Sequence, residues 1–251
     1  MIEIGHVYKS YDDTLIIDDL SLSIPKGGIV SIIGPNGAGK STLLTMISRL
    51  LPMDKGIITV DGLDVTKTSG DIFAKRLSIL KQENTISARL TVRDLVSFGR
   101  YPYSHGRLTK VDIQFIDSSI RYLRLEKLQN RFLDELSGGQ RQRAFVAMII
   151  CQDTDYVLLD EPLNNLDMQH SVSMMKHLRR AADELNKTVV LVMHDINFAS
   201  CYSDLIVALK EGKLVHSGTP KEIMQPEILK SIYDLNIHVS EINGQRIAIY
   251  Y

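Results

Sequence analysis

The sequence of 251 residues lacks the features of membrane-embedded and exported proteins. Its longest apolar run, Ala144 to Cys151, is far shorter than the roughly 20 residues that a membrane-spanning helix needs. Residues 1–13 include acidic side chains and no long apolar stretch, so we expect no signal peptide and predict a cytosolic chain. The sequence also shows no internal repeat and no low-complexity segment, and we expect no appended regulatory domain.

An excess of positive charge is also missing. The chain has 29 Lys and Arg residues against 30 Asp and Glu residues, and the basic residues are scattered. Nucleic acid is therefore not expected as a partner. The two cysteines, Cys151 and Cys201, lack metal-ligand spacing and are expected to be small buried side chains in a reducing compartment.

What is present is an alternation typical of an α/β protein. Segments 28–34, 156–161 and 188–194 are apolar runs without a polar face, which is typical of parallel strands buried on both sides. A helical pattern lies between the last two segments, with apolar residues listed as Val172, Met175, Leu178, Ala182 and Leu185. "IEIGHV", "LSLSIP" and "GIITVDG" predict strands of an antiparallel edge, with a turn at "YDDT" between the first two.

Helical signals replace strand signals in the middle of the chain. Thr91 and Asp94 form a predicted capping box, and Gly99 is a predicted helix stop. We expect a helical subdomain at about 87–152, inserted into the α/β core of one domain that spans 1–251. Near the C-terminal end, "TPKE" predicts another capped helix, and "INGQ" predicts a hairpin.

The first chemical motif is G-x-x-x-x-G-K-S, complete at Gly34, Gly39, Lys40 and Ser41. It follows a predicted buried strand and opens a predicted helix, which is the context that a phosphate-binding loop requires. Gly37 and Gly39 let backbone N–H groups turn toward phosphate oxygens, Lys40 adds positive charge, and the Ser41 hydroxyl can bind Mg²⁺. The motif predicts nucleotide binding.

Two carboxylates follow the next buried strand. In "YVLLDEPLNNLD", Asp160 and Glu161 lie at the carboxyl end of a strand, where open α/β sheets place their ligands. We expect Asp160 to orient water around Mg²⁺ and Glu161 to polarise the attacking water. On their own the two residues could equally cap a turn, and the phosphate-binding loop favours the catalytic reading. His194 ends the third strand in the same way. A lone histidine is usually a core residue with its hydrogen bonds satisfied, but one at this edge of the sheet could reach a γ-phosphate.

A second glycine pair occurs in "LSGGQRQR". Ser137 and Gln140 predict a capping box, so the helix that follows presents N–H groups and positive dipole potential to an anion. Gly138 and Gly139 let a phosphate approach the backbone. One chain with one nucleotide has little use for a spare set of donors, whereas two chains placed head to tail would use both. This pattern predicts hydrolysis that depends on dimerisation.

Taken together, Tyr11, "GPNGAGKST", Gln82, "LSGGQRQR", "VLLDEP", "NNLD" and His194 resemble the nucleotide-binding subunit of an ABC transporter over essentially the whole chain. The resemblance implies a P-loop ATPase fold with a RecA-like core, and ATP and Mg²⁺ as cofactors. It implies that Tyr11 stacks on adenine and that Glu161, His194 and Gln82 are catalytic. The residues it places at Mg²⁺ are Ser41, Gln82 and Asp160. The remaining residues that it places at ATP are Gly34, Pro35, Asn36, Gly37, Ala38, Gly39, Lys40, Ser41, Thr42, Ser137, Gly138, Gly139, Gln140 and Asp167.

The sequence departs from the family pattern in two ways. "PLNN" replaces the commoner Pro-Thr-Ser/Asn-Ala before Leu166. The resemblance implies that Asp167 lies on the loop that touches the opposite subunit, and this replacement implies that the details of that contact are particular to this chain. We also expect this chain to lack the terminal regulatory domain of some sugar importers, and therefore expect no regulation through such a tail.

A finer resemblance comes from Leu95 to Asp112, which is similar to ATPases of importers for ferric siderophores, cobalamin and haem, and nearest to the siderophore group. It implies a homodimer bound to integral-membrane permease subunits at the cytoplasmic face of the membrane, with an extracytoplasmic substrate-binding protein as an indirect partner. Tyr101 and Tyr103 are then docking residues on a loop, or else aromatic side chains packed on the helical subdomain.

Other classes stay open at this point. A cobalamin, haem or metal-ion importer would carry the same motifs, and so would a cluster-assembly ATPase of this length. A soluble P-loop phosphotransferase would have no "LSGGQ".

Overall fold

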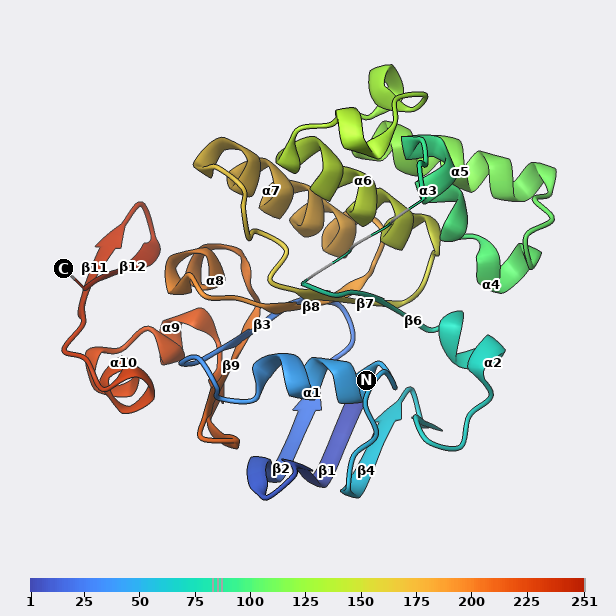
Figure 1. Ribbon diagram of the computed structural model, residues 1–251. Coiled ribbons are helices and arrows are strands. Elements are labelled where there is room, and N and C mark those ends of the chain that lie inside the picture. The colour runs from blue at the N-terminus through green and yellow to red at the C-terminus, as the bar shows by residue number, and fades with distance from the viewer. Residues whose placement is uncertain (83, 85, 87, 251) are drawn as a thin grey trace. The chain divides into compact units, whose positions relative to one another are not determined.

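The computed structural model describes residues 1–82, 84, 86 and 88–250, which form two compact units (Figure 1). The first unit combines Met1–Thr68 with Thr188–Tyr251, and the second is Ser69–Lys187. None of the helices described is both long enough and apolar enough to cross a membrane.

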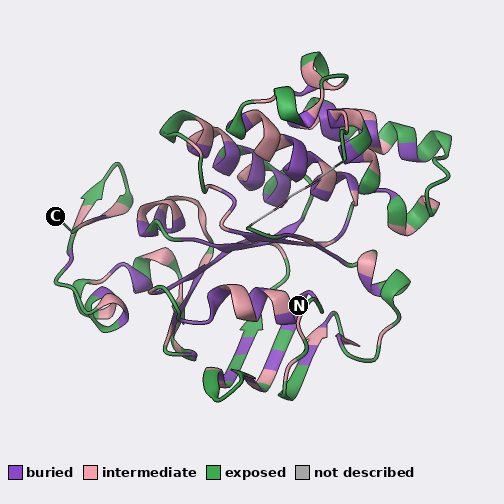
Figure 2. Cartoon of the chain, viewed as in Figure 1, coloured by how far each residue is buried: buried purple, intermediate pink, exposed green. Residues whose placement is uncertain are grey.

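An antiparallel sheet forms the N-terminal part of the first unit. Its strands follow the order β2-β1-β4-β5, with bounds β1 Ile2–Tyr11, β2 Thr14–Ile24, β4 Lys55–Val60 and β5 Leu63–Asp64. Buried and exposed residues alternate along these strands (Figure 2), as expected for a sheet with one face packed on a core. The predicted edge strands and the turn between β1 and β2 are confirmed.

Parallel strands form the centre of the same unit. Strand β3 (Gly28–Ile33) pairs in parallel with β8 (Thr188–Val192) and with β9 (Leu205–Lys210), and β10 (Lys213–Gly218) pairs antiparallel with β9. Every residue of β8 is buried, because β-branched and leucine side chains fill both faces of the strand. The α/β fold class with a parallel sheet and antiparallel strands is confirmed.

Short helices and a hairpin complete the first unit. The helices are α1 Lys40–Ile47, α8 Ile196–Tyr202, α9 Pro220–Ile223 and α10 Pro226–Tyr233. The predicted capping box at Thr219 and Glu222 is present at α9. Strands β11 (His238–Ile242) and β12 (Gln245–Ile249) form the predicted hairpin, and positive φ angles at Asn243 and Gly244 fit its tight turn.

The second unit is mainly helical. Its strands β6 (Leu77–Leu80) and β7 (Tyr156–Asp160) are parallel neighbours. Its helices are α2 Gly70–Ala74, α3 Val92–Phe98, α4 Tyr101–Ser104, α5 Lys110–Tyr122, α6 Gly138–Cys151 and α7 Met168–Glu184, with single 3₁₀ turns at Glu126–Leu128 and Leu133–Glu135. Capping boxes begin α3 and α6, as predicted.

The predicted apolar face of α7 is partly wrong. Met175, Leu178 and Ala182 are buried, but Val172 is half-buried and Leu185 is 41% exposed. Leu185 lies outside the face because the helix ends at Glu184 and Leu185 is its C-cap residue. Of the two cysteines, Cys151 is buried, whereas the predicted burial of Cys201 is only partial because α8 leaves it half-exposed.

The helical subdomain at about 87–152 stays a prediction. Helices α3 to α6 belong to the compact unit Ser69–Lys187, which also holds β6, β7 and α7. The predicted first residue, Ser87, lies outside the described residues.

Candidate functional site

The phosphate-binding loop lies in the first unit, between β3 and α1. Gly37 and Gly39 have φ angles of 79° and 92°, a left-handed backbone that favours glycine. A Cβ atom on Gly39 would lie 2.6 Å from Ile17 Cδ1, so the close approach of β2 also requires glycine there. Gly39 is the N-cap residue of α1 and has no side chain, so it offers no capping group to the first N–H groups of the helix.

Lys40 is held inside this loop. Its ammonium donates hydrogen bonds of 2.8 Å to the carbonyl oxygens of Gly34 and Pro35, and the residue is only 6% exposed. A buried ammonium beside the start of a helix gives this loop positive potential, and such a place suits phosphate oxygens. Ser41 and Thr42 follow in the first turn of α1.

His194 lies at the same edge of the sheet as this loop. Ile32 pairs with Val192 in the parallel ladder of β3 and β8, and the N–H of Met193 donates to the Ile32 carbonyl at 3.1 Å. Both strands therefore end together, and the exposed His194 follows one strand as the loop follows the other. Tyr11 ends β1 and is exposed, next to the turn into β2.

The two carboxylates lie in the second unit. Asp160 is the last residue of β7 and is 5% exposed, and Glu161 follows with a φ of 49°. Glu161 Oε2 accepts a hydrogen bond of 2.7 Å from Gln82 Nε2 and a second, short one from Asn164 Nδ2. Two amide groups thus fix this carboxylate at the point where the chain bends.

A pocket of about 240 Å³ brings three predicted site residues together. Gln82, Gly138 and Glu161 all line it. Other lining residues are Arg141, Gln142 and Asn164. Gln142 Nε2 donates to the Pro162 carbonyl at 3.1 Å, which ties α6 to the turn after Glu161.

The start of α6 has the predicted cap. Ser137 Oγ accepts from the Gln140 N–H at 3.3 Å, and Gln140 Oε1 accepts from the Ser137 N–H at 3.1 Å. Gly139 lies against the ring of His170, since a Cβ there would come within 2.6 Å of His170 Cδ2. A larger residue at this position would require the His170 ring to move.

Asp167 caps α7 and contacts the same histidine. Its carboxylate accepts from the His170 N–H at 2.8 Å and lies 2.7 Å from His170 Nδ1. The hydrogen bond from this N–H, followed by that from the ring, lowers the pKa of Asp167 below its ordinary value. His170 therefore joins the glycine pair at the start of α6 to the Asp167 loop within this unit.

The sequence reasoning missed Asn164 and His170. Each lies three residues after a predicted site carboxylate, Glu161 and Asp167, and this spacing is the signal that could have found both. In each case a hydrogen bond links this residue to the carboxylate three residues before it.

The two predicted loop tyrosines lie on the short helix α4 and not on a loop. Tyr101 is 61% exposed, whereas the ring of Tyr103 lies 4.0 Å from the guanidinium of Arg100. Arg100 is buried, pairs with Asp112 at 3.0 Å and donates to the Cys151 carbonyl. Tyr103 packs on Arg100 but is still 36% exposed, and Tyr101 is the more exposed of the two.

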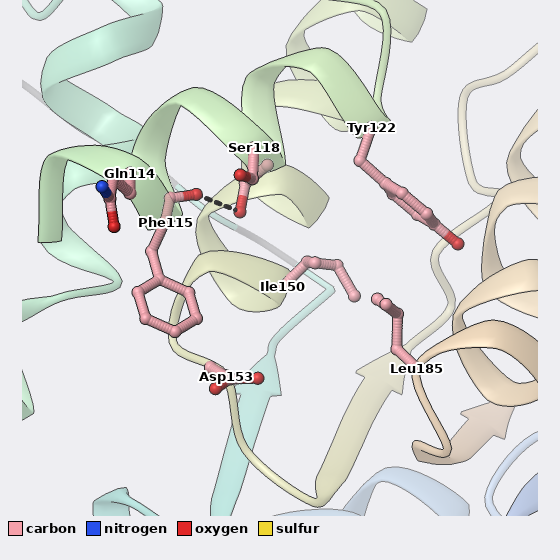
Figure 3. A pocket seen from close by; sticks show the side chains of 8 residues that line it. Gln114, Phe115, Ser118, Tyr122, Ile150, Asp153 and Leu185 are labelled. Atoms are coloured by element: carbon pink, nitrogen blue, oxygen red, sulfur yellow. Dashed lines mark hydrogen bonds between the residues drawn. The ribbon is translucent and has the colours of Figure 1, made fainter. Parts of the chain in front are cut away.

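A further hollow of about 270 Å³ lies between α5, the end of α6 and the residues after α7 (Figure 3). Phe115, Ile150 and Leu185 are among the side chains that face it. None of the predicted site residues lines it.

Comparison with known proteins agrees with this geometry. Residues 17–164 match the family model described as "ABC transporter". The chain is 54% identical over its whole length to the whole of the petrobactin import ATP-binding protein YclP of Bacillus subtilis. It is 55% identical, with both chains fully covered, to the petrobactin import ATP-binding protein FatE of Bacillus anthracis.

A solved structure also matches. The ATP-binding cassette MJ0796, dimeric in a post-hydrolysis state with ADP and Pi, superposes with a TM-score of 0.78 at 26% identity, over 88% of this chain and 99% of that one.

Proposed function

This chain belongs to the ABC transporter family, and on that premise we propose that it is the ATP-hydrolysing subunit of an importer for iron(III)-siderophore complexes. The assignment of the cargo rests on the similarity, over the whole chain, to two petrobactin import ATP-binding proteins. Petrobactin is therefore the first siderophore to test.

The phosphate-binding loop supports the ATP-binding part of this function. Its left-handed glycines and the buried Lys40 ammonium form a positively charged cradle at the start of α1. Within it, we assign phosphate contacts to residues 34–42 and adenine stacking to Tyr11.

We assign Mg²⁺ to side chains with hard oxygen atoms, which this ion prefers as ligands. Ser41 and Asp160 would hold the ion, with Gln82 beside them, and the ion would neutralise charge on the phosphates. We assign Glu161 the role of accepting a proton from the attacking water, with Gln82 and Asn164 fixing its carboxylate. His194 is assigned to the terminal phosphate.

The partners follow from the family. We propose that two copies of the chain bind permease subunits at the cytoplasmic face of the membrane, and that a substrate-binding protein delivers the cargo on the other side. The exposed Tyr101 and the neighbourhood of Gln82 are the proposed contact, because a residue that senses nucleotide and a nearby exposed surface can shift together between two states. Ser137 to Gln140 and Asp167 would then complete the nucleotide site of the other copy.

Uptake measurements test the cargo. Deleting the gene in its native host should abolish uptake of radiolabelled iron supplied as ferric petrobactin, while uptake of other ferric siderophores serves as the comparison. A plasmid copy of the gene should restore uptake, and a Lys40→Ala copy should not, because phosphate would meet backbone groups alone. If the deletion abolished cobalamin or haem uptake and left iron uptake unchanged for every chelate, the assigned cargo would be wrong. The assignment of ATP hydrolysis to this chain would still stand.

A further inference from the structure

A groove on the second unit, distant in sequence from the phosphate-binding loop, has the composition of an anion site. It has a volume of about 770 Å³, and its polar lining comes from Arg124, Gln169, Ser173, Lys176, His177 and Arg180. Three of these side chains carry permanent positive charge, and no carboxylate is among the residues that line the groove. Met168 and Val172 add an apolar wall.

The cations differ in how they are held. Arg180 forms a two-fold hydrogen-bonded pair with Glu184, both bonds being 2.9 Å, which neutralises part of its charge. Arg124 and Lys176 form no ion pair with any residue that the structure describes, and both are exposed. Arg124 follows α5 at a left-handed φ of 55°. These two side chains remain able to meet an anion.

His177 Nδ1 is buried and has no hydrogen-bond partner among the described residues, and the same holds for Arg143 Nε on α6. His177 lines the groove and is only 7% exposed. Buried polar atoms without a partner are rare in native proteins, and His177 is the groove residue that has one. Arg143 does not line the groove, but its Nη1 donates to the carbonyl of Leu123, the residue before Arg124.

Tyr122 contacts His177 through a hydrogen bond and through its ring. Its hydroxyl donates to the His177 carbonyl at 3.1 Å, and the centroids of the two rings are 6.1 Å apart. The same tyrosine also lines the hollow of Figure 3. Burial lowers the pKa of His177, and the charges of Arg124, Arg143 and Arg180 lower it further. Since those arginines lie close enough to affect the imidazole, an anion among them would have the opposite effect.

We propose that this groove binds a phosphate-bearing anion between Arg124 and Lys176, with His177 beside it. Guanidinium groups match the oxygen atoms of phosphate in pairs, and Ser173 and Gln169 supply neutral donors. The apolar wall suits the organic part of a phosphate ester. The shared chemistry is the phosphate group, which could come from free phosphate or from an ester such as a lipid headgroup.

The test follows the His177 ring in the full-length chain by NMR, with its signal assigned through His177→Gln among the 7 histidines. Inorganic phosphate and glycerol 3-phosphate are titrated separately at constant ionic strength. Each bound ligand should shift the His177 signal saturably and raise the pKa of the ring, because its negative charge favours the imidazolium. If glycerol 3-phosphate bound more tightly than inorganic phosphate, the phosphate group that this groove recognises would be that of an ester.

Matched variants make the test specific. The double variant Arg124→Gln, Lys176→Gln should weaken binding by at least about tenfold, or about 1.4 kcal/mol. The control is Lys127→Gln, an exposed cation of the neighbouring 3₁₀ turn that does not line the groove, and its affinity should equal that of the unchanged chain. A His177 signal that neither ligand shifts, or equal affinity in the double variant and the control, would overturn the proposal.

Discussion

Glu161 is held in a backbone conformation that glutamate rarely adopts. Its φ of 49° is left-handed, and a residue with a side chain persists there only when its surroundings determine the conformation, at a cost of about 1–3 kcal/mol. The surroundings here are the buried end of β7 and the amides of Gln82 and Asn164. The chain thus keeps this carboxylate at a fixed place despite the strain.

Replacing Glu161 by Gln should separate binding from chemistry. The substitution keeps the size of the side chain and removes the anion that accepts a proton, so ATP affinity should stay within a few-fold while turnover falls by about 100-fold or more. Steady-state hydrolysis and equilibrium binding of ATP to the purified chain measure the two quantities.

The chain offers a matched control for this change. Glu211 is also a glutamate at left-handed φ, 50°, in the turn between β9 and β10. Glu211→Gln should leave turnover unchanged. Near-normal hydrolysis by the Glu161 variant would remove that residue from its assigned role.

Contiguous motifs made much of the candidate site predictable at this scale. The loop 34–42 and the pair Asp160 and Glu161 could be identified because strand, turn and helix follow one another directly in the sequence. The contact of Gly139 with His170 could not, since it depends on how α6 packs against α7. The spacing of apolar residues in the sequence predicts a helix but does not specify which residues of two helices touch.

At the scale of elements, helix starts were the most predictable features. The capping boxes at Thr91, Ser137 and Thr219 are local, so four consecutive residues suffice to specify each one. The same pattern at Thr109 and Asp112 begins α5 and was overlooked in the sequence. The buried pair of Arg100 and Asp112 was not predictable, because Arg100 follows α3 and its burial depends on tertiary packing.

Gly99 shows how one residue sets the approach of two helices. It was predicted as a helix stop, and it is the C-cap of α3, but its φ is −57°, which any residue adopts. Glycine is required for a different reason: a Cβ atom would overlap the carbonyl oxygen of Met148 on α6 and lie 3.1 Å from Cys151 Cβ. Backbone atoms cannot move away as a flexible side chain would.

Gly99→Ala should therefore destabilise the protein by about 1–3 kcal/mol, the usual range for overpacking. Denaturant unfolding followed by circular dichroism measures the free energy of unfolding. Gly70→Ala is the control, since a Cβ there meets nothing within 4 Å at the start of α2. It should be neutral or stabilising by about 0.5–1 kcal/mol. Equal stability of the two variants would show that α3 and α6 can separate without loss.

At the scale of the whole molecule, the residues that we assign to the nucleotide come from both compact units. Lys40 and His194 belong to the first unit, whereas Glu161 and Ser137 belong to the second. The similar MJ0796 cassette is dimeric with ADP and Pi. A dimer placed head to tail would let the α6 start of one copy meet the phosphate bound by the other, and its two-fold symmetry would create two equal sites.

Mixed dimers test this arrangement. Ser137→Arg should leave ATP binding intact and suppress hydrolysis, because a bulky cation then blocks the start of α6. Lys40→Ala should lose ATP binding. A dimer of one Ser137→Arg chain and one Lys40→Ala chain has one complete site, made from the intact phosphate loop of the first and the intact α6 start of the second, so mixing two inactive proteins should restore hydrolysis.

The control for this mixture is a chain that carries both substitutions. Paired with either single variant, it leaves every site with at least one defect, so hydrolysis should stay absent although dimers form. Differently tagged chains, captured on one tag and detected by the other, establish that mixed dimers are present in each sample. Mixed dimers of the two single variants that remain inactive would show that Ser137 acts within its own chain, and the dimer would then have to control hydrolysis by another route.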